Sequence, residues 1–342
     1  MTFWQQLVDH LNTGEPAFVA QVAFNTTHSP GTRGAKMFVE PDGTITGTIG
    51  GGGMEADVIE KGLEALGSEE YTPGCETLVH RKEGQGKKSG LICAGKQTHL
   101  YWVARPDRDL AILEEVVERL EHDKPGLMTI DEVGLALGRE ESIERETPPV
   151  RLVEDDEAAG GWQYEEQIIN WKRAAVVGGG HVGAAVCRQL AMLGYSVENF
   201  DTRADIFEWR DEEWAAHRHV VDDYVEAGDL VRFPQLTHAI VVTSDQPSDV
   251  RGLQGLAGKP FPYIGAMGSP AKLHKIREDL LAEGVDESFF DAWHAPIGLE
   301  MTSNKPPEIA VSIASELLRL REELFPHADA PTPGELDEDP PF

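Results

Sequence analysis

Cysteine is scarce in this sequence of 342 residues: only Cys75, Cys93 and Cys187 occur, and they are far apart. A disulfide framework is therefore not expected, and a reducing cytoplasm is the natural compartment. Long hydrophobic runs are also missing, since no stretch approaches the ~18 uninterrupted apolar residues of a membrane span. The first residues, MTFWQQLVDHLNTG, lack the basic segment and apolar core of a signal peptide. The sequence predicts a soluble, cytoplasmic protein.

Basic side chains are few, with 30 Lys and Arg against 60 Asp and Glu, so the formal net charge is −30. Such a surface repels nucleic acid and anionic lipid, and neither is expected as a partner. An excess of carboxylates is also typical of an acidic proteome in a salty cytoplasm, where the repulsion is screened. Whether the charge reflects a halophilic source is left open.

The length predicts two domains, at about 150 residues per domain. We expect a smaller, mixed α/β N-terminal domain over residues 1–137. Residues 138–170 are acidic and contain a Pro pair and a Gly pair, so we interpret them as an acidic linker, although a strand at 150–153 is left open. A Rossmann-like domain is expected over 171–328, followed by a disordered acidic tail over 329–342.

The prediction for the second domain rests on short apolar runs that alternate with helical stretches. Runs of this kind occur at 174–177, 196–200, 238–243 and 261–264, and a final amphipathic helix is expected over 307–324. Alternation of this type indicates βαβ units and a parallel sheet.

The clearest motif, GGGHVG, follows the first of these runs and opens a helix. Gly178 allows a tight turn, Gly180 lets the backbone approach a pyrophosphate, and Gly183 permits close helix packing. Asp201, at the end of the next strand, is placed to accept hydrogen bonds from ribose hydroxyls. His181 lies in the same region without an assigned proton transfer. The alternative is that these glycines serve only helix–strand packing.

A second candidate anion site is GAMGSPAK, after the strand that ends near residue 264. Gly268 precedes Ser269, the expected N-cap, and Lys272 lies in the first helical turn, so amides and a cation could converge on one phosphate. Helix capping alone would also explain the pattern. Asp245 and Asp249, in a loop after another strand, could line the same crevice or serve as ordinary helix caps.

A third feature is the run of four glycines that ends at Gly53. Such a run is costly to order, so Gly51, Gly52 and Gly53 indicate a close approach of the backbone to a ligand or partner. Glu55 follows in the first helical turn, where it could also simply favour the helix dipole. Cys93 lies in a turn of small residues, and it is either a reactive thiol or a small core side chain. The histidines show no metal-ligand spacing, so no metal site is expected.

The order of these motifs along the chain is that of a known family. The sequence resembles the XdhC/CoxI family of xanthine dehydrogenase accessory proteins over nearly the whole chain. The blocks that carry the resemblance are Thr26 to Pro30, Gly34 to Met37, Gly51 to Glu55, VVGGGHVG, Asp201 with Arg203, YIGAMGSPAK at 263–272, PIGLEM at 296–301 and PPEIAVSIASEL at 306–317. Departures are Ala94 in a family Cys-Gly-Gly, Gly53 where some relatives have Cys, and the loop SDQPSD in place of a Thr-His pattern.

The resemblance implies a cofactor-binding chaperone, and no catalytic residue is assigned. Such a protein binds the molybdenum cofactor, as molybdopterin or its dinucleotide form, protects it while a cysteine desulfurase supplies sulfur, and delivers it to a xanthine dehydrogenase-like molybdenum hydroxylase. We expect the cofactor between the two domains, with its phosphate at 178–183 and 268–272 and its pterin and metal end at 51–55 and Cys93. A homodimer is left open.

Two alternatives remain at this stage. The glycine fingerprint with Asp201 also fits an NAD(P)-dependent oxidoreductase. It fits equally a regulator of the hydroxylase that senses a dinucleotide. No acid and base pair at a defensible spacing supports the oxidoreductase.

Overall fold

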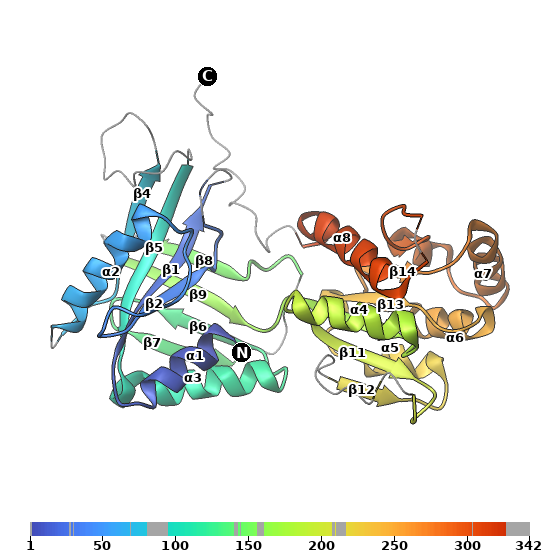
Figure 1. Ribbon diagram of the computed structural model, residues 1–342, viewed down its shortest axis with the longest axis horizontal. Helices are drawn as coiled ribbons and strands as arrows, with labels where there is room; N and C mark the ends of the chain where they lie inside the picture. The colour runs from blue at the N-terminus through green and yellow to red at the C-terminus, as the bar shows by residue number, and fades with distance from the viewer. Residues whose placement is uncertain are drawn as a thin grey trace, which may run out of the picture. The chain divides into compact units, whose positions relative to one another are not determined.

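The computed structural model describes residues 2–26, 29, 31–68, 70–80, 95–139, 143, 145–155, 161–206, 209, 217–302 and 304–325. Two compact units make up the described chain, the first extending to Ile169 and the second covering Asn170–Phe325 (Figure 1). Cys93 and the predicted tail over 329–342 lie outside the described residues.

A five-stranded antiparallel sheet, in the order β3-β2-β1-β5-β4, forms the centre of the first unit. Its central strand β1 pairs with β2 and β5, and α2 packs on one face over a core that includes Phe18, Met54 and Tyr101. The other face packs on α1 and α3. The elements are α1 (Phe3–Leu11), β1 (Ala17–Asn25), β2 (Lys36–Val39), β3 (Ile45–Gly47), α2 (Gly53–Leu66), β4 (Gly74–His80), β5 (Gly95–Ala104) and α3 (Pro106–Glu121).

The segment predicted as an acidic linker, 138–170, instead supplies strands to a second antiparallel sheet of the same unit. This sheet has the order β7-β6-β9-β8. Its strands are β6 (Gly126–Ile130), β7 (Leu135–Arg139), β8 (Val150–Asp155) and β9 (Gly161–Ile168). The linker interpretation was wrong because every second residue at the end of β9 is buried, and one of these buried residues is the acid Glu166, which breaks the apolar alternation in the sequence.

One buried polar cluster joins the two sheets of this unit. Glu166 of β9 accepts a hydrogen bond from the Tyr164 hydroxyl at 2.8 Å, and its other oxygen lies 2.9 Å from Nζ of Lys36 on β2. Lys36 therefore has a packing role within the family block Gly34 to Met37.

With β8 and β9 included, the first unit is not the smaller of the two, contrary to the sequence prediction.

In the second unit, six parallel strands form one sheet in the order β12-β11-β10-β13-β14-β15. Numbered along the chain, this is 3-2-1-4-5-6, the order of a Rossmann fold. The predicted parallel sheet is thus confirmed. Its strands are β10 (Arg173–Val177), β11 (Ser196–Asp201), β12 (His217–Val220), β13 (Thr237–Val241), β14 (Tyr263–Ala266) and β15 (Trp293–His294).

Helices cover both faces of this sheet, and each face has its own core. On one face α4 and α8 pack over Val176, Ile240 and Tyr263, and on the other α6 and α7 pack over Val177, Phe200 and Val241. The helices are α4 (His181–Met192), α5 (Ala227–Leu230), α6 (Gln246–Leu256), α7 (Pro270–Ala282) and α8 (Pro306–Leu324), with short 3₁₀ turns at Tyr224–Glu226, Pro234–Leu236 and Glu287–Ala292.

The helices that the structure describes all fall short of a membrane span in length or in apolar character. Among the same described residues, no three His, Cys, Asp or Glu side chains gather as a metal site would require.

Candidate functional site

Two glycines of the GGGHVG turn are required by packing. Gly178, directly after β10, has a φ of 110°, and a Cβ there would lie 2.6 Å from the carbonyl oxygen of Val242. A Cβ on Gly183 would lie 1.9 Å from the carbonyl oxygen of Gly178. The interpretation that these glycines serve packing is therefore sufficient for Gly178 and Gly183.

Gly180 differs from both. It is the N-cap of α4 with an ordinary φ of −72°, and the nearest atom to a Cβ at this position is Nη2 of Arg203, at 4.0 Å. Packing thus gives no reason for a glycine here. The space above it is bordered by a guanidinium and by the N-terminus of α4, where backbone N–H groups and the helix dipole favour an anion. His181, the first residue of α4, is exposed beside it.

The carboxylate of Asp201 is fully buried, and the structure shows contacts that fill its hydrogen-bonding capacity. Oδ2 accepts from the Gly179 N–H at 2.7 Å and from Arg203 Nη2 at 2.9 Å, while Oδ1 accepts from Arg203 N at 3.0 Å and Nε at 2.8 Å. A carboxylate offers about four acceptor sites. The predicted hydrogen bonds to ribose hydroxyls would therefore require one of these contacts to break.

Electrostatics agree with this assignment. Burial raises the pKa of Asp201, but the hydrogen bonds from Arg203 and from the Gly179 N–H outweigh burial and hold the pKa below its usual value. Burial, together with the charge of Asp201, raises the pKa of Tyr224. Asp201 is thus an ionised partner for Arg203.

Asn199 and Trp209, which the sequence did not single out, hold the GGGHVG turn in place by hydrogen bonds. Asn199 in β11 donates to the carbonyl oxygens of Val176 at 2.8 Å and Gly178 at 3.2 Å, and it accepts from Trp209 Nε1 at 2.6 Å. No sequence pattern singled out Asn199, because Ser196, Glu198 and Asp201 make the same strand rich in polar residues. Arg203 entered the sequence analysis only as part of a family block.

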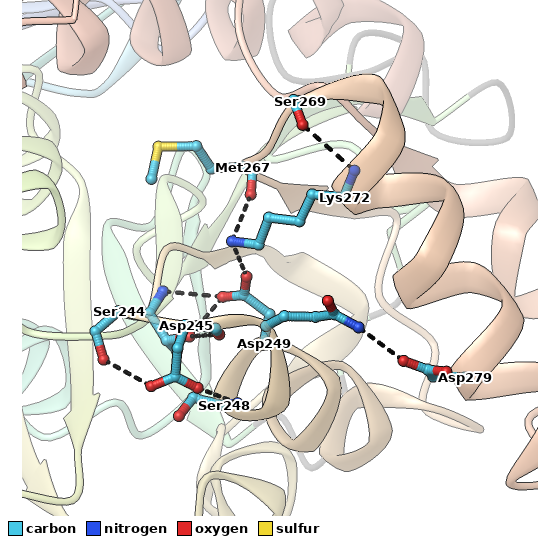
Figure 2. A network of polar contacts seen from close by, with 10 residues as sticks. Ser244, Asp245, Ser248, Asp249, Met267, Ser269, Lys272 and Asp279 are labelled. Carbon is cyan, nitrogen blue, oxygen red and sulfur yellow. Dashed lines mark hydrogen bonds and ion pairs between the residues drawn. The ribbon is translucent and has the colours of Figure 1, made fainter.

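The second predicted anion loop is closed by an internal ion pair (Figure 2). Ser269 is the N-cap of α7, as predicted, and accepts from the Lys272 N–H at 3.3 Å. The Lys272 ammonium, however, lies 2.5 Å from Oδ2 of Asp249 and 3.5 Å from the carbonyl oxygen of Met267. A Cβ on Gly268 would lie 3.0 Å from Cδ of Lys272, so the lysine stem packs directly against this glycine.

Asp249 has only 2% of its surface exposed, and its Oδ1 accepts from the Thr243 hydroxyl at 2.5 Å and its N–H at 3.2 Å. Burial raises the pKa of Asp249, and the contacts with Lys272 and Thr243 offset only part of this rise. Asp245 is the N-cap of α6, where it accepts from the Ser248 N–H at 2.9 Å. In this structure the cation of Lys272 is neutralised by a carboxylate of its own chain.

Family blocks near the end of the unit also have packing roles. Glu316 on α8 accepts from the Tyr263 hydroxyl at 2.8 Å and from the Gly298 N–H at 2.6 Å. A Cβ on Gly298 would lie 2.6 Å from Oγ of Ser312, which donates to the carbonyl oxygen of Leu299. The PIGLEM segment is thus anchored on the last helix.

In the first unit the glycine run is ordered by Glu55. Gly50, Gly51 and Gly52 all have a positive φ, and Gly52 is the N-cap of α2, which begins at Gly53. Oε1 of Glu55 accepts from the Thr48 hydroxyl at 2.6 Å, the Ile49 N–H at 3.0 Å and the Gly51 N–H at 2.9 Å. Burial raises the pKa of Glu55, but these bonds outweigh it and leave the pKa lowered.

Glu55 thus binds its own loop, and two of the loop amides are already in use. The approach of Gly51, Gly52, Gly53 and Glu55 to a pterin remains a prediction. So does the role of Cys93, which lies outside the described residues.

Comparison with known proteins connects these features. Residues 175–317 match the family model described as the XdhC Rossmann domain, and residues 10–78 match that of the XdhC and CoxI family. The chain belongs to the XdhC and CoxI family. The first match runs from β10 into α8 and includes the GGGHVG turn, and the second includes the glycine run and Glu55.

Two relatives extend the comparison. The chain is 24% identical over 309 residues to the uncharacterized protein YqeB of Escherichia coli, a match that covers 90% of this chain and 44% of the relative. The chain therefore spans less than half the length of that relative. It also resembles a crystal structure described as a xanthine dehydrogenase from Bacillus halodurans, with a TM-score of 0.68 and 20% identity, over 94% of this chain and 96% of the other. At that identity the likeness shows a shared fold.

Proposed function

We propose that this XdhC family protein binds the molybdenum cofactor and delivers it to a xanthine dehydrogenase-like molybdenum hydroxylase. The observation that carries the proposal is the open space at Gly180, bordered by the α4 N-terminus and by Arg203. Helix N–H groups beside a half-exposed guanidinium, in a chain of net charge −30, favour one localised anionic ligand. Membership of the XdhC and CoxI family, which the sequence resemblance associates with accessory proteins of xanthine dehydrogenase, supports the identity of that ligand.

The cofactor is cargo in this proposal, not a resident group. Its pterin carries a phosphate, in some forms extended to a dinucleotide, and the phosphate would be held by α4 amides and the Arg203 guanidinium. The protein would bind, shield and release the cofactor without covalent turnover. Its partners would be the hydroxylase and a cysteine desulfurase in the cytoplasm, and self-association as a homodimer is a further possibility to test.

The test is native mass spectrometry of the full chain purified from a host that makes the cofactor, combined with molybdenum analysis and pterin fluorescence. We expect molybdenum and pterin near one per chain, and activation of an apo-hydroxylase when the loaded protein is added. Protein that carries neither from such a host, and that fails to activate the apo-enzyme, would refute the proposal.

A second candidate function is favoured by the strand order 3-2-1-4-5-6, which is also that of NAD(P)-binding domains. In that case the protein is an NAD(P)-dependent oxidoreductase or a dinucleotide-sensing regulator of the hydroxylase. Oxidation of NADH with a small carbonyl substrate would indicate the enzyme. Tight NAD(P) binding without turnover and without molybdenum would indicate the sensor.

A further inference from the structure

Rossmann domains distinguish their ligands at the end of the second strand. An acidic residue there binds the ribose hydroxyls of NAD, whereas an arginine nearby accommodates the 2′-phosphate of NADP. In this chain the second strand is β11, which ends at Asp201, and Arg203 follows two residues later. Both residue types are therefore present at the position that decides between a diol and a phosphate.

The contacts of Asp201 leave it unable to bind ribose hydroxyls in the usual way. Its side chain is inaccessible to solvent, and its two oxygens accept four hydrogen bonds, three of which come from Arg203. A ribose diol that bonded to both oxygens in place of the guanidinium would replace two bonds from a charged donor with bonds from neutral hydroxyls. Charge-assisted bonds are the stronger ones, so this exchange is unfavourable.

The position of Arg203 suits the second role. Asp201 holds the guanidinium through both Nε and Nη2, in the paired geometry that fixes the plane of the group. The side chain is nevertheless 50% exposed, and its Nη2 is the nearest atom to the Cβ position of Gly180. A held guanidinium thus faces the part of the turn that packing leaves open.

We propose that Arg203, positioned by Asp201, determines specificity for ligands that carry a phosphomonoester, against the same ligands with a free hydroxyl. The inference rests on the proposed function, because it concerns the ligand of the same turn. A phosphate oxygen beside the guanidinium makes a charge-assisted hydrogen bond that a hydroxyl cannot match. The expected preference for the phosphorylated ligand is about 10- to 100-fold in Kd.

Two matched ligand pairs test this with the full chain. One pair is the oxidised fluorescent pterin monophosphate derived from molybdopterin and the same pterin after phosphatase treatment, titrated by fluorescence. The other is NADP⁺ and NAD⁺, titrated by calorimetry. In each pair the members differ by one phosphomonoester. We expect wild-type protein to prefer the phosphorylated member of every pair that binds.

Three variants separate specificity from folding. Arg203→Gln should abolish the preference by weakening the phosphorylated ligand alone, and Asp201→Asn should reduce it in the same direction because the guanidinium is no longer held. Arg277→Gln is the matched control, since it removes a partly exposed, ion-paired arginine from the second half of α7 and should leave both affinities unchanged. Thermal melts establish that each variant is folded.

Each other outcome is decisive. Equal affinity for the members of both pairs, or a preference that survives Arg203→Gln, overturns the inference. If Asp201→Asn weakens NAD⁺ rather than NADP⁺, Asp201 is a ribose acceptor and the inference is again overturned. If neither pterin binds but NADP⁺ is still preferred through Arg203, the proposed function fails and the inference stands. Failure of all four ligands to bind refutes both.

Discussion

Lys272 on α7 and Asp249 on α6 form an ion pair, with Nζ 2.5 Å from Oδ2, at the carboxyl ends of β13 and β14 (Figure 2). The carboxylate is buried and the lysine is partly exposed, with 28% of its side chain accessible. The pair thus connects two helices that begin after neighbouring strands, and it occupies a loop that the sequence predicts as a phosphate site.

Removing the carboxylate should be costly. We expect Asp249→Ala to lower the free energy of unfolding by about 3 kcal/mol, because it leaves Lys272 beside a carbonyl oxygen without its counter-charge and the buried Thr243 N–H without its acceptor. Urea denaturation of the full chain measures the change. Lys275→Met, on an exposed lysine of the same helix, is the control and should have no measurable effect. An Asp249→Ala protein as stable as wild type would contradict the assigned role.

Substitutions at Gly180 and Gly183 should affect different properties, ligand affinity at Gly180 and stability at Gly183. Gly180→Asp places a side chain and a negative charge in open space, so ligand affinity should fall by about 100-fold or more while the melting temperature stays near wild type. Gly183→Ala should instead destabilise the fold by more than about 3 kcal/mol, because its Cβ would meet the Gly178 carbonyl oxygen. Retained affinity in Gly180→Asp would show that the ligand binds elsewhere.

The lowered pKa of the buried His238 predicts that the folded protein loses stability in acid. Burial lowers the pKa of this histidine from 6.5 to about 4, with a smaller contribution from His294, although a hydrogen bond to the Arg173 carbonyl opposes the shift. Between these values the unfolded chain binds a proton that the folded chain does not. The stabilisation is therefore complete above pH 6.5 and is lost as the pH falls towards 4, by about 3 kcal/mol in total.

Unfolding free energies of the full chain, measured from pH 4 to pH 7, check this expectation. The ring packs against Tyr195, Tyr263 and Phe325, so His238→Phe retains an aromatic side chain and removes the titration. We expect a shallower slope in the variant over this range. Identical slopes in the two proteins would exclude His238 as the origin of the pH dependence.

Cys93 carries the remaining prediction about the metal end of the cargo. If its thiolate contacts that end, Cys93→Ser should retain severalfold less molybdenum after purification, with pterin phosphate affinity unchanged. Cys75→Ser is the control. Equal molybdenum in Cys93→Ser and wild type would make the thiol a packing residue.

The local signals in the sequence proved sufficient for part of the fold. The GGGHVG turn and the alternation of apolar runs with helices depend on residues close together in the chain, and the parallel sheet and α4 were predicted correctly from them. The second sheet of the first unit was missed. Its strand β9 pairs with β6 and β8, and the buried acid Glu166 interrupts the apolar alternation between Tyr164 and Ile168.

By itself the sequence determined where the glycine turn after β10 lies, because the spacing of Gly178, Gly180 and Gly183 after a strand is a local property of the chain. It did not determine which charges remain for a ligand. The tertiary structure decided that: it pairs Lys272 with Asp249 and Glu55 with its own loop, and it buries Asp201 against Arg203 while half of the arginine side chain stays exposed. The physical reason is that the nearest charged or polar group in space determines whether a side chain's charge is available to a ligand. That group is often on another strand or helix.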